Sequence, residues 1–334
     1  MNTEIQNIKQ RFEIIGTYSG LDRAIEKAVR VSPTDITVLV TGESGVGKEA
    51  FPKIIHQLSH RKHNKFIAVN CGAIPEGTID SELFGHEKGS FTGADEKKDG
   101  KFLVANGGTI FLDEVSALPI DMQGKLLKVL VENSVTKVGS DQKIDVDVRF
   151  ISATSSDLSE KIKAKLFRED LFHRLNVVPI KIPNLNERIE DIPILAEHFV
   201  EKLSLSNGLV SRDFSDEALS FLQSMSWPGN IRQLKNLIER VLILGDPSNQ
   251  ISRDELVLSD VLTEDKSDKK SLISEELSSM PLREAREVFE RDYLILQINR
   301  FSGNISKTAS FVEMERSALH RKLKSLGINS GQKN

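Results

Sequence analysis

The stretch Thr41-Gly42-Glu43-Ser44-Gly45-Val46-Gly47-Lys48 decides the fold of this chain, and it follows the apolar run Ile36-Thr37-Val38-Leu39-Val40. The three glycines allow a tight turn in which backbone N–H groups point at anionic oxygens, and Lys48 can reach the outer phosphates. The positive end of the helix that is expected to follow adds to this field. The spacing therefore predicts a phosphate-binding loop, with a chance glycine turn as the alternative.

Glu49 departs from the usual pattern of such loops. A Ser or Thr hydroxyl commonly follows the lysine and binds Mg²⁺, whereas this chain has a carboxylate there. We therefore expect Mg²⁺ to depend on a residue elsewhere in the chain.

The composition is typical of a globular protein with two or three domains, since 39% of the 334 residues are apolar and 28% are charged. No apolar stretch approaches the roughly 18 residues that a membrane span needs, and the polar start Met1–Arg11 has no signal-peptide character. We therefore expect a cytoplasmic protein without a membrane partner. The single cysteine, Cys71, excludes an internal disulfide and a multi-thiolate metal site.

Short apolar runs alternate with helical segments along the first half of the chain. The runs cover residues 37–40, 66–69, 109–112, 148–152 and 177–182. This alternation predicts an α/β fold with a mostly parallel sheet that is covered on both faces. The later pattern is helical, so we predict an α/β nucleotide-binding subdomain, an α-helical lid, a polar linker and a terminal α-helical domain at residues 1–183, 184–262, 263–279 and 280–334.

Two carboxylates follow the third run, in Gly107-Gly108-Thr109-Ile110-Phe111-Leu112-Asp113-Glu114. Open α/β sheets bind their ligands at the carboxyl ends of the strands, which is where these acids stand. Asp113 would hold Mg²⁺ or its water shell, and Glu114 would polarise the attacking water. The alternative is a solvated pair of acids, which the phosphate loop upstream disfavours.

Several further segments stand in a familiar order. They are Gly42–Glu49, Glu82-Leu83-Phe84-Gly85-His86-Glu87, Gly89-Ser90-Phe91-Thr92-Gly93-Ala94, Phe167-Arg168-Glu169-Asp170-Leu171-Phe172-His173-Arg174-Leu175 and Trp227-Pro228-Gly229-Asn230-Ile231-Arg232. With them the chain resembles, from about residue 12 to 328, the AAA+ ATPase core of bacterial enhancer-binding proteins, the activators of sigma-54 RNA polymerase. Through Ala94 the resemblance is closest to standalone activators, and from about residue 166 the chain is similar to nitrogen-assimilation response regulators.

The resemblance implies an AAA+ P-loop domain with a five-stranded parallel sheet, a helical lid, ATP and Mg²⁺ as cofactors, and assembly from dimers into a ring that is commonly a hexamer. It also implies the residues of the nucleotide site. The implied catalytic residues are Asn70, Asp113, Glu114, Thr154, Arg168 and Arg174, and the implied nucleotide-binding residues are Ile15, Gly16, Gly42, Glu43, Ser44, Gly45, Val46, Gly47, Lys48, Glu49 and Arg232.

Within this set the resemblance assigns separate roles. Arg168 and Arg174 would be arginine fingers that reach the γ-phosphate held by a neighbouring subunit, which suits the permanent charge and planar fork of arginine. Arg232 would sense the γ-phosphate within its own subunit, and Asn70 would engage Glu114. The chain departs from the family at Ser155, where asparagine is more usual, and at Asn186, where arginine is usual.

The segment Gly89, Ser90, Phe91, Thr92, Gly93 and Ala94 resembles the surface loop that contacts sigma-54 in this family. Glycines at both ends let such a loop fold down or stand up with little backbone strain, and they leave Phe91 and Thr92 as the contact. A tight turn around a core Phe is the alternative. Ser90 stands where alanine is usual.

The C-terminal segment has a basic character of its own. Residues 281–334 carry ten Lys/Arg and six Asp/Glu, which is a net charge of +4. Because the whole chain has a net charge of −4, the remaining residues have a net charge of −8. Helices are predicted over 281–300, 306–312 and 315–326. On the last of these, leucines share one face, while the opposite face carries the residues predicted to bind DNA: Arg316, Ser317, His320, Arg321 and Lys324.

A solvated basic face is the alternative to DNA binding. However, Gly303-Asn304-Ile305 and Ala318–Leu323 resemble the Fis-type helix-turn-helix that ends many of these activators. About 12 residues precede the ATPase core. We therefore expect either a standalone activator, controlled by an upstream regulatory partner or by its own abundance, or a chain shortened from a longer one.

The whole pattern predicts an ATPase that binds upstream double-stranded DNA and remodels the sigma-54 RNA polymerase holoenzyme. Two alternatives stay open at this point. One is an AAA+ DNA motor, and the other is a DNA-binding regulator or repressor that uses nucleotide only for assembly.

Overall fold

The computed structural model describes residues 2–91, 94–261, 291, 294, 305, 308–309 and 314–325. The chain divides into two compact units, Met1–Ser259 and Asp260–Asn334. Over the described residues, none of the helices combines the length and the hydropathy needed to cross a membrane.

A parallel sheet of five strands forms the centre of the first unit, in the order β2-β5-β8-β1-β9. The strands are β1 (Val38–Thr41), β2 (Phe66–Asn70), β5 (Thr109–Asp113), β8 (Arg149–Thr154) and β9 (Val178–Lys181). The register pairs Thr41 with Thr154 and Asn70 with Asp113. The carboxyl ends of the strands therefore line up along one edge, and the predicted α/β fold is confirmed.

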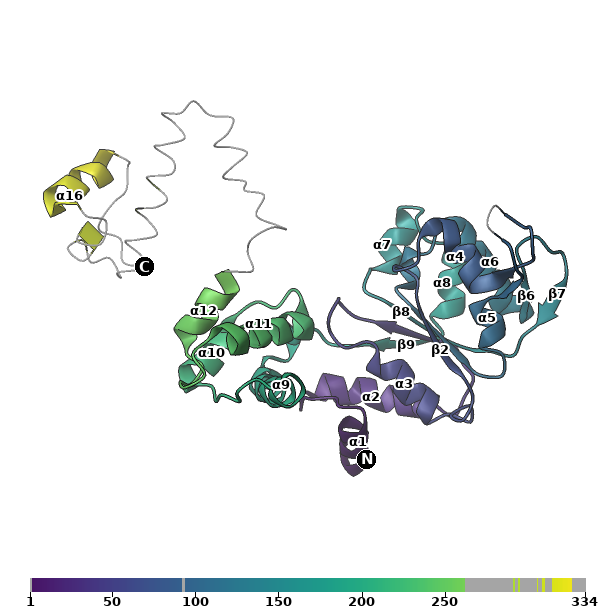
Figure 1. The fold of residues 1–334 in the computed structure, drawn as a ribbon, viewed down its shortest axis with the longest axis horizontal. Helices are drawn as coiled ribbons and strands as arrows, with labels where there is room; N and C mark the ends of the chain where they lie inside the picture. The colour runs from purple at the N-terminus through teal and green to yellow at the C-terminus, as the bar shows by residue number, and fades with distance from the viewer. Residues whose placement is uncertain are drawn as a thin grey trace. The chain divides into compact units, whose positions relative to one another are not determined.

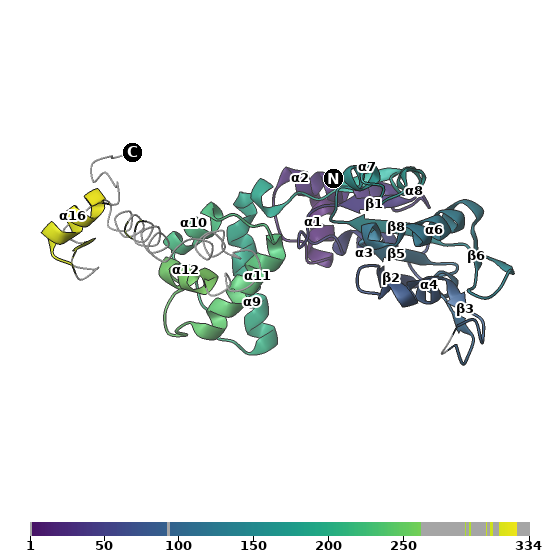
Figure 2. The same ribbon diagram turned by 90° about the horizontal axis from the view of Figure 1, so that it is seen from above.

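Two groups of helices cover the two faces of this sheet (Figures 1 and 2). One face packs on α2 (Ser19–Val31) and α3 (Ala50–Gln57), and α1 (Asn2–Arg11) contacts α2 and adds to the same core. The other packs on α4 (Glu76–Phe84), α5 (Lys101–Val104), α6 (Ile120–Glu132), α7 (Leu158–Lys163) and α8 (Glu169–Leu175).

Strand β1 shows how the sequence divides between these two cores. Val38 and Val40 join the core on the α2 side, whereas Leu39 joins the core on the α6 side. Successive side chains of a strand point to opposite faces, so a continuous apolar run is required where both faces are covered.

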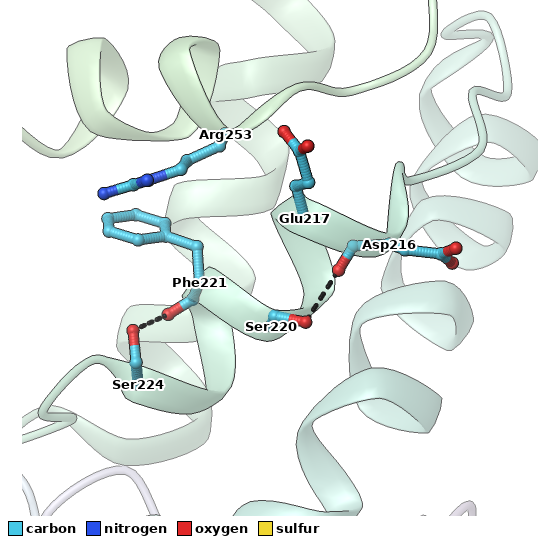
Figure 3. Close-up of a pocket in the computed structure, with 6 residues that line it drawn as sticks. All are labelled: Asp216, Glu217, Ser220, Phe221, Ser224 and Arg253. Atoms are coloured by element: carbon cyan, nitrogen blue, oxygen red, sulfur yellow. Dashed lines mark hydrogen bonds between the residues drawn. The ribbon is translucent and has the colours of Figure 1, made fainter.

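The lid is helical, as predicted. It consists of the 3₁₀ turns η2 (Leu185–Glu187) and η3 (Ile189–Asp191), followed by α9 (Ile192–Asn207), α10 (Asp216–Ser224), α11 (Asn230–Leu244) and α12 (Arg253–Val261). Trp227 is fully buried in the lid core, and its indole N–H donates to the carbonyl of Leu222 at 3.0 Å. On the lid surface, the guanidinium of Arg253 lies over the ring of Phe221 (Figure 3).

The first lid helix differs from the sequence expectation at both ends. The periodicity predicts a helix over residues 189–203, but α9 begins at Ile192 and ends at Asn207. Proline is favoured in the first turn of a helix, and Pro193 stands there. Gly208 has a positive φ of 68° and ends the helix.

Some elements had no sequence prediction. They are α1, the 3₁₀ turn η1 (Val115–Ala117) and two antiparallel pairs, β3 (Gly85–His86) with β4 (Lys98–Asp99) and β6 (Ser134–Thr136) with β7 (Lys143–Asp145). Strands of two or three residues are too short to show an alternating pattern, and α1 has just two apolar side chains, Ile5 and Ile8, both of them buried.

In the second unit, the helix predicted at 315–326 is present as α16 (Arg316–Ser325). Its Leu319 and Leu323 are buried together with Leu294 and Ala309. The linker at 263–279 and most of the helices predicted at 281–300 and 306–312 lie outside the described residues.

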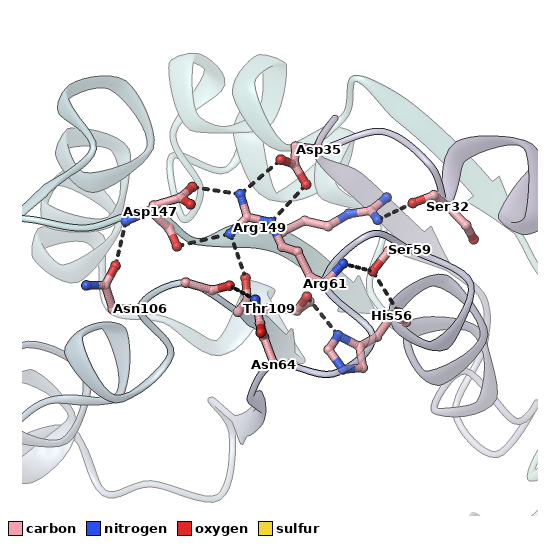
Figure 4. A network of polar contacts seen from close by, with 12 residues as sticks. Ser32, Asp35, His56, Ser59, Arg61, Asn64, Asn106, Thr109, Asp147 and Arg149 are labelled. Atoms are coloured by element: carbon pink, nitrogen blue, oxygen red, sulfur yellow. Dashed lines mark hydrogen bonds and ion pairs between the residues drawn. The ribbon is translucent and has the colours of Figure 1, made fainter.

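Arg61 ties together the strand ends opposite the phosphate loop (Figure 4). Its guanidinium pairs with Asp35, which precedes β1, at 2.9 Å and with Asp147, which precedes β8, at 2.7 Å. It also donates to the carbonyl of Gly108, directly before β5, at 3.4 Å. Nearby, the buried Arg149 donates to the carbonyls of Ser32 and Val31, and burial lowers the pKa of this guanidinium to about 10.

We predict that Arg61→Lys destabilises the protein although it keeps the charge. A lysine ammonium cannot bridge two carboxylates and a carbonyl as a planar fork does. Because Asp35 and Asp147 are largely exposed, the expected loss in the free energy of unfolding is about 1 kcal/mol. Urea denaturation measures this loss. The control is Arg30→Lys, in the exposed pair with Glu26, which should change little; equal stability of Arg61→Lys and wild type would contradict the prediction.

Candidate active site

The phosphate-binding loop joins β1 to α3. Gly45 and Gly47 have φ values of +80° and +95°, and a Cβ on Gly45 would lie 2.3 Å from the carbonyl oxygen of Gly229. Only glycine fits there. Lys48 is buried, and its Nζ donates to the carbonyls of Gly42 at 2.8 Å and Glu43 at 3.1 Å, so the ammonium is held over the loop.

Glu114 meets this lysine from the end of β5. Its Oε1 lies 3.5 Å from Lys48 Nζ, and its Oε2 accepts hydrogen bonds from both the backbone N–H and the hydroxyl of Ser155 at 3.0 Å. The backbone of Glu114 is left-handed, with φ and ψ of 49°. That conformation costs a non-glycine residue on the order of 1 kcal/mol. The contacts with Lys48 and Ser155 hold the carboxylate in this place.

Asp113, the neighbouring carboxylate, has a different environment. Burial, with repulsion from Glu114 second, raises the pKa of Asp113. Asn70 Nδ2 donates to Asp113 Oδ2 at 3.2 Å, while Asn70 Oδ1 accepts from the amides of Gly72 and Ala73. Asn70 thus contacts Asp113 rather than Glu114, the partner that we expected. The register explains this, because Asn70 and Asp113 face each other on β2 and β5.

The donor set at this edge suits Mg²⁺. Hard carboxylate oxygens are its ligands, and it is commonly bound through one or two carboxylates together with phosphates. Among the described residues no group of three or more His, Cys, Asp and Glu could hold a metal by itself. A cation at Asp113 would also offset the repulsion from Glu114 and from the exposed Glu49.

Thr154 lies one position before the residue that faces the site. It is fully buried, and its hydroxyl accepts the N–H of Ser156 at 3.1 Å. Ser155, which stands where the family more often has asparagine as a sensor, is the residue that reaches Glu114. The sequence pattern along β8 and the loop after it was too short to predict which of the two side chains, Thr154 or Ser155, faces the site.

A cavity of about 190 Å³ lies beside the phosphate-binding loop, and its volume and largely apolar walls suit part of a nucleotide such as the base. The predicted Ile15 is in its wall, and the neighbouring Gly16 accepts a hydrogen bond from Lys9 at 2.7 Å. The apolar lining comes from the segment before α2, from the phosphate-binding loop and from α2, α3, α9 and α11: Ile14, Ile15, Leu21, Val46, Ala50, Phe51, Leu195, Phe199 and Ile231.

Two lid residues from the sequence analysis have clear contacts. Arg232 Nη1 donates to the hydroxyl of Ser44 in the phosphate-binding loop at 3.2 Å. The side-chain oxygen of Asn186 accepts the N–H of Trp227 at 2.9 Å, so the departure from arginine at this position has a structural role in the lid.

The two predicted arginine fingers are exposed: Arg168 directly precedes α8, and Arg174 lies on it. Arg168 forms an ion pair with Asp170 at 2.7 Å, and Arg174 donates to the carbonyl of Leu130 at 3.0 Å. Within the part of the chain that the structure describes, neither has a hydrogen bond or ion pair with the phosphate-binding loop. A single chain therefore does not bring them to its own Lys48.

The predicted contact loop is described in part. Phe91 is 45% exposed, and its ring meets the buried His86 edge-on with the ring centroids 4.9 Å apart. The Ser90 hydroxyl is buried without a hydrogen-bond partner among the described residues. Ala94, which we expected to contact a partner, is buried in this conformation. Thr92 and Gly93 lie outside the described residues.

On α16 the predicted DNA-binding face is exposed. Arg316, Ser317, His320 and Arg321 are on the surface, while Leu319 and Leu323 on the other face are buried. Lys324 belongs to this helix, but its side chain lies outside the description.

Comparisons with known families identify the domains of the chain. A model of the sigma-54 interaction domain matches residues 14–181. The chain belongs to this family of sigma-54 activators. A model of the AAA+ ATPase lid domain matches residues 186–273, and a model of Fis-family bacterial regulatory proteins matches residues 285–326. The protein is thus an AAA+ ATPase with a helix-turn-helix module.

Relatives of this sigma-54 activator include the nitrogen assimilation regulatory protein NtrX of Azorhizobium caulinodans. The two are 46% identical over 327 residues, 97% of this chain and 71% of NtrX. The transcriptional regulatory protein GlrR of Escherichia coli is 43% identical over 90% of this chain and 65% of its own. The chain thus spans about two thirds of the length of these regulators, and the likeness to NtrX is not confined to the residues after about 166.

Solved structures of NtrX from Brucella abortus have the same architecture. The complex with ATP is 43% identical, with a TM-score of 0.68 over 95% of this chain and 69% of the other. The complex with ADP is 42% identical, with a TM-score of 0.70 over 98% and 72%.

The Ser90 hydroxyl, which has no hydrogen-bond partner among the described residues, gives a prediction for the contact loop. Ser90→Ala should stabilise the described conformation by about 1 kcal/mol, because the substitution removes this buried polar group. The amides of Gly89 and Ala94, which are hydrogen-bonded within this loop, should then exchange with deuterium about fivefold more slowly.

Ser140→Ala is the matched control, because the Ser140 hydroxyl accepts the N–H of Gln142 in a neighbouring loop and its loss should not slow exchange. Unchanged or faster exchange of the two amides in Ser90→Ala would contradict the prediction.

Proposed function

We propose that the protein is an ATP-dependent transcription activator that binds upstream double-stranded DNA and remodels the sigma-54 RNA polymerase holoenzyme to open the promoter. One observation carries this proposal: in a chain of the sigma-54 interaction family, Lys48 and Glu114 approach to 3.5 Å beside the phosphate-binding loop. A lysine for the phosphates and a carboxylate for the water are the parts that phosphoryl transfer to water requires.

The nucleotide would occupy the edge of the sheet and the cavity beside it. The base fits the apolar cavity, and the phosphates would lie over the N–H groups of the loop and Lys48. Asp113 would hold Mg²⁺, which neutralises phosphate charge when it is bound. Glu114 would orient and polarise the water, while Ser155 keeps that carboxylate in position. The ATP and ADP complexes of Brucella abortus NtrX support nucleotide binding here.

The protein would act as a homo-oligomer, from dimers up to a hexameric ring. Arg168 and Arg174 are exposed, and among the described residues neither has a hydrogen bond or ion pair with the phosphate-binding loop, so they are available to a neighbouring subunit. In such a ring each active site would combine Lys48 and Glu114 of one subunit with arginines of the next. An upstream regulatory partner would control assembly.

The second unit would supply DNA binding. The exposed polar and basic face of α16 is the kind of surface that enters the major groove, while the leucines on its other face pack inside the module. Basic side chains here would also contact phosphates, so DNA affinity should fall as salt rises.

Subunit complementation tests the shared site. Arg168→Ala and Lys48→Ala should each lower ATP hydrolysis, by on the order of 10³-fold for the arginine. An equimolar mixture should regain part of the activity, because some interfaces then combine an intact Lys48 with an intact Arg168. The wild-type rate per subunit should also rise with protein concentration.

The control is Lys163→Ala, a change of another cation at the end of α7, which should not lower the rate. Two results together would exclude the shared site. The wild-type rate per subunit would not change with protein concentration, and Arg168→Ala would hydrolyse ATP as fast as wild type.

Open-complex formation on a sigma-54 promoter separates the proposal from its two alternatives. Thr92→Ala should abolish promoter opening while ATP hydrolysis and DNA binding persist, because only the contact with sigma-54 is changed. A DNA motor or a regulator that uses nucleotide only for assembly would not depend on Thr92. Unchanged transcription in Thr92→Ala, with Thr78→Ala on α4 as the control, would contradict the proposal.

A further inference from the structure

The carboxylate of Glu43 connects the phosphate-binding loop to two separate parts of the lid. Its Oε1 accepts a hydrogen bond from Asn184 Nδ2 at 2.8 Å, and its Oε2 accepts one from Asn230 Nδ2 at 3.0 Å. Asn184 precedes the first lid turn η2, and Asn230 begins α11. A single side chain of the loop therefore holds both the entrance of the lid and its principal helix.

Asn230 is suited to this contact in three ways. It is fully buried, and its backbone is left-handed with φ of 52°, a conformation that asparagine tolerates better than most residues. Its side-chain oxygen accepts the N–H of Leu185 at 2.7 Å. Its Nδ2 donates to the carbonyl of Ser44 at 3.1 Å as well as to Glu43. Neither aspartate nor alanine could make all of these bonds.

These bonds lie where the lid and the loop together enclose the base cavity. Val46 and Gly47 line the cavity from the loop, while Leu195, Phe199 and Ile231 line it from the lid. Ile231 directly follows Asn230 in the chain. The width of the cavity therefore depends on how closely the lid lies against the loop.

Glu43 has a charge that is unfavourable for direct contact with a phosphate. Its carboxylate is satisfied by two neutral amide groups instead, and the bond from Asn230, followed by that from Asn184, lowers the pKa of Glu43. The negative side chain of Glu43 thus binds the lid, although it belongs to the phosphate-binding loop.

We propose that Glu43 is a positioning residue that holds the lid against the phosphate-binding loop through Asn184 and Asn230 and thereby sets the affinity for a nucleotide. The identity of the nucleotide as ATP or ADP rests on the proposed function. The bonds themselves are formed between residues of one chain and need neither sigma-54 nor DNA.

Glu43→Gln is the decisive variant because it keeps the shape of the side chain. A glutamine has one acceptor oxygen and one NH₂ group, so one of the two asparagine NH₂ groups would face another donor. The Kd for a fluorescent ADP analogue and the KM for ATP should each rise about tenfold. At saturating ATP, kcat should change less than about twofold, because the bound nucleotide restores the closed lid.

Two further variants test the same contact from the lid side. Asn184→Ala should raise Kd in the same direction, and Asn230→Gly should do so while it keeps the left-handed backbone. The double variant Glu43→Gln with Asn230→Gly should bind the ADP analogue as tightly as the weaker-binding of the two single variants. The reason is that each single substitution already removes the same contact between Glu43 and Asn230. Glu190→Gln, an exposed change in the turn η3, is the matched control and should bind as wild type does.

An unchanged Kd in both Glu43→Gln and Asn184→Ala would overturn the inference, and so would a lower kcat at unchanged KM, which would place Glu43 in the hydrolysis step. Absence of ADP-analogue binding by the wild type would overturn it as well. Failure of the proposed function gives a different result: the wild type would bind the analogue, with the variants weakened as expected, but would not open a sigma-54 promoter.

Discussion

The contact of Glu114 with Lys48 depends on a costly left-handed backbone at the end of β5, and the nucleotide site depends on that contact. The parallel register makes it possible. Because β1, β5 and β8 are neighbours that end at one edge, the phosphate-binding loop after β1, the carboxylates at the end of β5 and Ser155 after β8 meet there. The surrounding structure has to hold Glu114 in place, since its backbone would otherwise prefer another conformation.

Charged side chains have different roles at the two edges of the sheet. At the amino-terminal edge Arg61 bridges Asp35 and Asp147, which fixes the starts of the strands. At the carboxyl edge the acids Asp113 and Glu114 are neighbours, and burial together with repulsion from Glu114 raises the pKa of Asp113. The ion pairs of Arg61 thus lie at one edge of the sheet, and the carboxylates of the candidate site lie at the other.

The sequence was informative wherever a pattern repeats or a motif has a backbone requirement. The five strands, the helical lid, the phosphate-binding loop and α16 follow from periodicity and from glycine spacing. Side-chain partners were less accessible. Asn70 was assigned to Glu114, but the register places it against Asp113, and the pairing of two strands distant in the chain has no local signal.

The contact of Ser155 with Glu114 was not predicted for a related reason, because it depends on the direction of a side chain beyond the end of β8. The contacts of Glu43 with Asn184 and Asn230 join positions that are 141 and 187 residues apart. A single sequence without its structure gives no indication that such residues meet. Composition and motifs therefore predict the parts of the site, while tertiary packing determines which parts touch.

The most direct measurement is promoter opening by Glu114→Gln on a sigma-54 promoter with ATP. The glutamine keeps an oxygen for Ser155 but cannot act as the carboxylate that polarises water. The variant should bind ATP as tightly as wild type, hydrolyse it extremely slowly and leave the promoter closed, whereas wild type opens it. Promoter opening by Glu114→Gln at the wild-type rate would contradict the claim that hydrolysis at this edge of the sheet drives activation.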